Sequence, residues 1–131
     1  MKNEYCDFNL EQSLKEIEEY RFPTKIEKRL KELARYSIED EPYTTPINPI
    51  SLKLFHDFIN IYTISPSIVL TPMNNIQIEY KNGDRKVILD FQDEERIRYL
   101  ICYIAPLKRI SGKMDLYEMI YHKGEKNDFN F

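Results

Sequence analysis

The sequence predicts an α+β fold, in which an antiparallel sheet of about four strands in meander order is packed by helices on one face. Two observations lead to this prediction. Near residue 68 the apolar residues change from helical spacing to alternation with polar residues. Within the alternating part lies Asn82-Gly83, a strong hairpin signal. A helical hairpin is expected to precede the sheet.

The composition of the chain argues against nucleic-acid binding and against a membrane-spanning protein. The chain has 131 residues, of which 42% are hydrophobic and 31% are charged, so we expect one folded domain. Its formal net charge of -3 argues against a nucleic-acid binder. No apolar run approaches the ~20 residues of a membrane span, and the N-terminus shows no signal-peptide pattern. With two distant cysteines, the protein is expected to be cytoplasmic, away from membranes.

Residues 1–48 are expected to form a helical arm. The first helix is predicted to begin at an N-cap, Asn9, and to end before Pro23. The second helix is predicted to begin at Thr24, because Thr24 and Glu27 have capping-box spacing. Both helices carry apolar stripes, whose residues include Leu10 and Leu14 in the first and Ile26 and Leu30 in the second.

Residues 37–48 lose helical periodicity and are predicted to be a hinge. They contain two prolines and the acidic run 39–41. The arm holds 8 basic and 11 acidic residues, so it accounts for the whole net charge. An acidic arm of this kind suits a basic partner.

Residues 49–124 are expected to form the α+β domain. Its first helix should have Asn48 as N-cap and Pro49 as first helical residue, and should be the best buried helix. A strand over residues 68–71 and a turn over 72–75 follow. A two-residue turn at Asn82-Gly83 would then pair the strands so that residue 79 lies opposite residue 86.

A three-residue loop over residues 93–95 gives the next pairing. It places Asp90 opposite Arg98 and Leu89 opposite Tyr99, which keeps charges on one face and apolar side chains on the other. Pro106 should end this strand, and residues 107–110 could add a short edge strand. The last helix is predicted to open at Asp115 and to close near residue 123, before a flexible tail over residues 125–131.

No motif marks an enzyme. His56 next to Asp57 suggests a general base, but adjacent helical residues point about 100° apart, which favours a structural histidine. His122 suits the C-terminal end of the last helix. Neither these histidines nor Cys6 and Cys102 have the close spacing of a metal site, and we expect no metal and no cofactor.

The polar face of the sheet is the alternative site. Glu79, Asp90 and Arg98 should share it with Lys86, where paired carboxylates could serve acid–base chemistry or a small ligand. Alternating charges favour ordinary cross-strand pairing instead. A third alternative is weak nucleic-acid binding by basic residues at the strand ends, namely Arg85, Arg96, Arg98, Lys108 and Arg109.

Residues 49–121 resemble a class of small, largely uncharacterised bacterial α+β proteins carried on plasmids, prophages and defence islands. The resemblance rests on residues 65–72, 76–80, 82–84 and 110–112, with a helix before a proline-flanked strand and a closing helix after the meander. It implies an accessory, antitoxin-like or inhibitor protein, and it supplies no catalytic residue.

The function predicted from these observations is a non-enzymatic module that binds another protein. The last helix is apolar on nearly every side, so part of it must meet another helix or a partner. The partner would be a basic nuclease or toxin, or a second copy of the chain. The candidate contact residues are Tyr117, Tyr121, Met119, Leu10, Leu14, Ile26 and Leu30.

Overall fold

A computed structural model describes residues 4–40, 45–92, 94–123, 129 and 131, with the side chains of 4–8, 40 and 123 outside the description. Within these residues lie four helices and one five-stranded sheet. In chain order the elements are α1 (Glu4–Tyr20), α2 (Thr24–Asp40), α3 (Pro49–Ile61), β1 (Ser67–Leu70), β2 (Ile76–Asn82), β3 (Arg85–Phe91), β4 (Ile97–Ile104), β5 (Leu107–Met114) and α4 (Leu116–Lys123).

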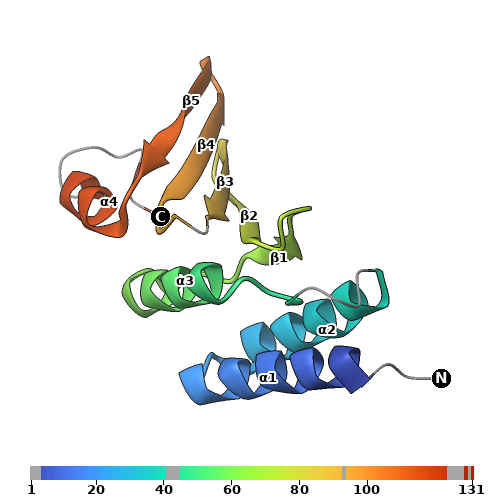
Figure 1. The fold of residues 1–131 in the computed structure, drawn as a ribbon. Coiled ribbons are helices and arrows are strands. Elements are labelled where there is room, and N and C mark those ends of the chain that lie inside the picture. The colour runs from blue at the N-terminus through green and yellow to red at the C-terminus, as the bar shows by residue number, and fades with distance from the viewer. Residues whose placement is uncertain (1–3, 41–44, 93, 124–128, 130) are drawn as a thin grey trace.

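The sheet is antiparallel throughout, and its strands lie in chain order from β1 to β5. This confirms the α+β class and the meander order, with one strand more than the four expected. Figure 1 shows the α1–α2 hairpin, α3 and the sheet stacked in that order. Helix α3 contacts β2 and β3, and α2 contacts β1.

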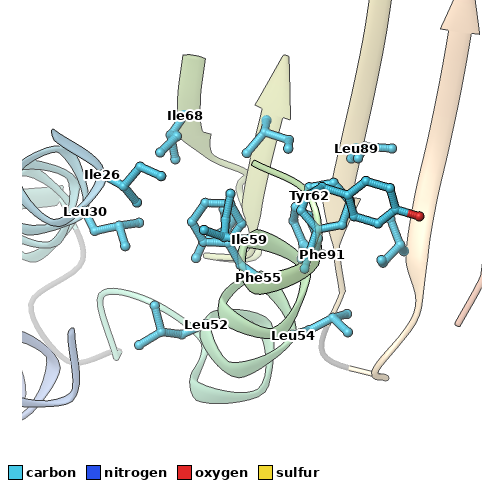
Figure 2. Packing of buried hydrophobic residues seen from close by; sticks show 14 of the residues in the cluster. Ile26, Leu30, Leu52, Leu54, Phe55, Ile59, Tyr62, Ile68, Leu89 and Phe91 are labelled. Carbon is cyan, nitrogen blue, oxygen red and sulfur yellow. The ribbon is translucent and has the colours of Figure 1, made fainter. Parts of the chain in front are cut away.

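One hydrophobic core runs through all of these layers. In Figure 2, Ile26 and Leu30 of α2 face Phe55 and Ile59 of α3. Ile68 of β1 lies near Ile26, and Leu89 of β3 lies on the other side of α3. The helical hairpin therefore shares its core with the sheet. An arm joined in this way is part of the folded domain and buries the apolar stripe that a partner would otherwise meet.

Both arm helices begin earlier than expected. Helix α1 starts at Glu4 and includes Asn9, which is therefore not its N-cap; an interior Asn costs a helix only a few tenths of a kcal/mol. It ends at Tyr20, and Arg21 follows in the left-handed region with φ 56°. Thr24 is the first residue of α2 rather than its cap, since the Glu27 N–H donates to the Pro23 oxygen at 2.9 Å.

The predicted hinge is ordered wherever it is described. Residues 37–40 are the last residues of α2, and residues 41–44 lie outside the described residues. Beyond them Ile47 is buried in the core, and the Asn48 N–H donates to the Asn74 oxygen at 2.9 Å. As predicted, the Asn48 side chain caps α3 by accepting from the N–H groups of Ile50 and Ser51, with Pro49 as first residue.

The β2–β3 register differs from the prediction by two residues. Gly83 and Asp84 form the two-residue loop, so Glu79 lies opposite Ile88 and not opposite Lys86. Gly83 has φ 65°, which fits a turn with glycine at its first central position. A shift of two leaves every side chain on its predicted face, and the Lys86 and Glu79 side chains still meet diagonally at 2.9 Å.

The β3–β4 register is the predicted one, with Asp90 opposite Arg98 and Leu89 opposite Tyr99. Strand β5 is longer than the short edge expected at residues 107–110, and it pairs with β4 from Leu107 to Met114. Ala105 and Pro106 form the turn between them, with a cis peptide bond.

Aromatic rings from the last residues complete the core. Phe129 is buried, with its ring 5.2 Å from that of Tyr99, and the ring of Phe131 lies 5.4 Å from that of Tyr62. At these two positions the segment expected to be a flexible tail packs on the sheet. Residues 125–128 and 130 of that tail lie outside the described residues.

Candidate partner-binding groove

A groove of about 570 Å³ opens between α3 and α4. Its walls come from the two helices, and Glu95, from the β3–β4 loop, contributes to its rim. The lining residues are Ile50, Lys53, Leu54, Asp57, Asn60, Ile61, Glu95, Asp115, Leu116, Tyr117 and Ile120.

The α3 wall follows one face of that helix. Ile50, Leu54 and Ile61 are spaced by four and seven residues, which places them on successive turns of one side. Ile50 and Ile61 are 43% and 39% exposed, although α3 also has the largest number of core residues of the four helices. The apolar surface of α3 is therefore wider than the sheet and the arm can cover.

The α4 wall begins at a local cap and is attached to the core through Met119. The Asp115 carboxylate caps the helix by accepting from the Glu118 N–H at 2.8 Å. Met119 points into the core with no exposed surface, and its main-chain oxygen accepts from the Tyr62 hydroxyl at 3.4 Å. With Met119 inside, Tyr117 is turned outward and is 85% exposed.

The rim of the groove is acidic. Asp57, Glu95 and Asp115 contribute three carboxylates, and Lys53 contributes the single cation among the lining residues. Lys53 lies 3.0 Å from Asp57, and this hydrogen bond raises the pKa of the Lys53 ammonium. Its charge is therefore already matched by Asp57, and Glu95 remains for a cationic ligand together with the second oxygen of Asp115, whose Oδ1 caps α4.

The structure separates the predicted contact residues into two groups. Tyr117 lines the groove, and Tyr121, one turn further along α4, is 67% exposed. Met119, Ile26 and Leu30 are buried in the core, and Leu10 and Leu14 are partly buried against it. These five are not a free surface, because the arm uses its apolar stripe to join the domain.

The predicted polar-face site is not a converging cluster. Asp90 lies opposite Arg98, while Glu79 pairs with Lys86, so the two carboxylates have different partners. Burial raises the pKa of the Asp90 carboxyl, although the Gln92 side chain, Arg98 and Lys113 oppose that shift. The basic residues are divided as well: Arg85 is buried, and its cross-strand partner is Tyr103, whereas Arg98 lies near the other end of the sheet.

In the described part of the chain, no three His, Cys, Asp or Glu side chains come together as a possible metal site. His56 lies between aromatic rings, 4.7 Å from Tyr20 and 5.3 Å from Phe22, which is a structural environment. Cys102 is a free, half-exposed thiol on β4. The Cys6 side chain lies outside the described residues.

Sequence reasoning missed the α3 wall of the groove. The signal was the width of the apolar stripe on α3, whose residues at 54 and 61 extend beyond what one sheet face can cover. Among the described helices none is long and apolar enough to cross a membrane. Comparison with protein-family models, curated proteins and solved structures found no significant match to this chain.

Proposed function

We propose that this protein is a non-enzymatic interaction module that holds an amphipathic helix of another protein in the groove between α3 and α4. The observation that carries the proposal is an apolar groove lined by three carboxylates and one cation, Lys53, which Asp57 already pairs. Grooves of this kind bind helices through apolar anchors on successive turns.

The length of the groove suits a helix of about three turns. Ile50 and Ile61 are 11 residues apart on α3, which at ~1.5 Å per residue corresponds to roughly 16 Å. Tyr117, on the opposite wall, offers a large, rigid contact surface of the type that is enriched at interfaces. A partner helix would bury this ring together with Ile50 and Ile61.

The acidic rim favours a partner helix with positive charge along its edges. Glu95 and Asp115 attract lysine or arginine at the edges of the bound helix, which raises the association rate and excludes acidic helices. A basic nuclease or toxin is a partner of this chemistry, so an antitoxin-like or inhibitor role is part of the proposal. The same acidic rim opposes dimerisation through the groove.

The test uses two synthetic amphipathic helices with identical leucine anchors, one with lysine and one with glutamate on its flanks. We expect the full chain to bind the lysine peptide, and Tyr117→Ala to weaken binding by about tenfold. Tyr36→Ala is the matched control, because Tyr36 is also exposed, at 59%, but lies on α2. Equal binding of both peptides, or equal effects of both variants, would refute the proposal.

A further inference from the structure

The two edge strands of the sheet, β1 and β5, differ in length and in how far the rest of the described chain covers them. Strand β1 has four residues, contacts α2, and has its Ile68 oxygen occupied by Arg29 Nε at 3.0 Å. Strand β5 has eight residues and forms the other edge, where β4 is its only strand neighbour among the described residues (Figure 1). An edge of this length offers a row of main-chain donors and acceptors to an added strand.

The exposed edge is cationic. Strand β5 carries Lys108, Arg109 and Lys113 and no acidic residue. Lys113 is paired with Glu94 at 2.9 Å, and the Lys108 ammonium lies 5.9 Å from the centre of the Tyr103 ring. Arg109 is exposed, and Lys113 lies opposite a further cation, Arg98, on β4.

These charges oppose pairing of β5 with a second copy of itself. In a two-fold antiparallel pair centred on Ser111, Arg109 of each copy would face Lys113 of the other. Like charges placed directly opposite one another destabilise a strand pair, and lysine on an edge strand is a common guard against self-association. The same charges attract a strand that carries carboxylates.

We infer that the β5 edge binds an extended acidic segment of a partner protein, which adds to the sheet as a sixth strand. Main-chain hydrogen bonds would supply the affinity, and alternate side chains would supply the selectivity. Residues 109, 111 and 113 lie on one face of β5, so acidic side chains at alternate positions of the segment would meet Arg109 and the remaining N–H donors of Lys113, whose ammonium also binds Glu94. Ile110 and Met114 lie on the other face, where apolar side chains would follow.

This site is independent of the α3–α4 groove. The groove has an acidic rim and suits a cationic helix, whereas the β5 edge is basic and suits an acidic strand. A single segment cannot satisfy both. Loss of helix-peptide binding therefore refutes the proposed function without touching this inference, and the reverse also holds.

The test uses the full chain and three blocked ten-residue peptides. The first alternates Glu and Val, the second has Lys in place of Glu, and the third is the first peptide with an N-methyl group at every residue, which blocks both of its edges. We expect the first peptide alone to bind in fluorescence anisotropy and to slow amide hydrogen exchange in residues 107–114. N-methylation blocks strand pairing while leaving the charges in place, so binding of the third peptide would overturn the inference.

Charge reversal on the protein provides a second test of the inference. We expect Arg109→Glu with Lys113→Glu to weaken binding of the Glu-Val peptide by about tenfold or more, since both cations lie on the face that the acidic side chains would meet. Lys28→Glu with Arg35→Glu on α2 is the control, because both residues are exposed and the net charge changes equally. The inference would be overturned if both pairs of substitutions weakened binding equally, or if the Glu-Val peptide did not bind at all. It would also be overturned if a second copy of the chain slowed amide hydrogen exchange in β5 as the protein concentration rose.

Discussion

The Ser51 hydroxyl of α3 donates to the main-chain oxygen of Phe91, the last residue of β3, inside the core. The same hydroxyl accepts from the N–H of Ile76, at 2.8 Å, and Ile76 lies directly opposite Phe91 in the sheet. One buried side chain thus satisfies two main-chain groups where the β2–β3 ladder ends. This contact fixes α3 along the sheet, and with it the position of the α3–α4 groove.

Ser51→Ala should lower the free energy of unfolding by about 1–3 kcal/mol, because it leaves a buried N–H and a buried oxygen without that partner. Chemical denaturation measures the loss. Ser65→Ala is the control, since Ser65 is exposed, and it should change stability by less than about 0.5 kcal/mol. Equal unfolding midpoints for the two variants would contradict the role assigned to Ser51.

Gly112→Ala should destabilise the fold by about 1–3 kcal/mol through a steric clash. A Cβ at this position would lie 2.6 Å from the Tyr99 Oη and 2.9 Å from its Cζ, because the Tyr99 ring crosses the glycine on the neighbouring strand. Tyr99→Leu should therefore relieve part of the cost in the double variant, as measured by a thermodynamic cycle.

Gly83→Ala provides the contrasting case. No atom lies within 4 Å of a Cβ built there, but φ is 65°, so the expected cost is backbone strain of about 1 kcal/mol. Tyr99→Leu should not change that cost. If the effects of Gly112→Ala and Tyr99→Leu were additive, or if those of Gly83→Ala and Tyr99→Leu were coupled, the clash with Tyr99 would not be the cause of the destabilisation.

Asp90→Asn should raise the free energy of unfolding at pH 7. Burial raises the pKa of the Asp90 carboxyl in the folded protein, so its ionisation opposes folding. This loss of stability sets in as pH rises from about 4, where the unfolded carboxyl titrates, through the folded pKa. The advantage of the Asn variant should therefore shrink as pH falls through that range. Denaturation at a series of pH values measures it, and an advantage that grows on acidification would reverse the assignment.

Phe129→Ala should lower the free energy of unfolding by about 3 kcal/mol, because it empties a buried aromatic position beside Tyr99 and His122. Tyr121→Ala, on the exposed side of α4, should cost less than about 0.5 kcal/mol. If Phe129→Ala were equally mild, the last residues would not contribute to the core.

Local chemistry made much of the fold predictable. The cap of α3, the opening of α4 and the β3–β4 register each follow from residues close in sequence. The β2–β3 register was off by two because side-chain alternation cannot distinguish two registers with the same faces. The full length of β5 was missed because Gly112 and three cations lower its strand propensity, while its pairing with β4 and the ring of Tyr99 compensate.

The candidate site was only partly predictable. Surplus apolar surface on α4 was visible in the sequence, and Tyr117 and Tyr121 are exposed in the fold. The groove was not visible in the sequence, because its two walls, α3 and α4, are separated along the chain by all five strands. Periodicity also could not say whether Ile26 and Leu30 would contact a partner or the domain itself, since both outcomes need the same apolar stripe.

The cations along β5 also determine how the purified protein should respond to salt. Repulsion between charges acts over ~10 Å in 0.1 M salt but only ~3 Å in 1 M salt, and paired strands lie about 4.8 Å apart. Two copies should therefore stay apart in dilute buffer and begin to join edge to edge as the salt concentration nears 1 M. Salting-out of this protein is then expected to start as ribbon-like pairs, with Arg109 and Lys113 at the seam.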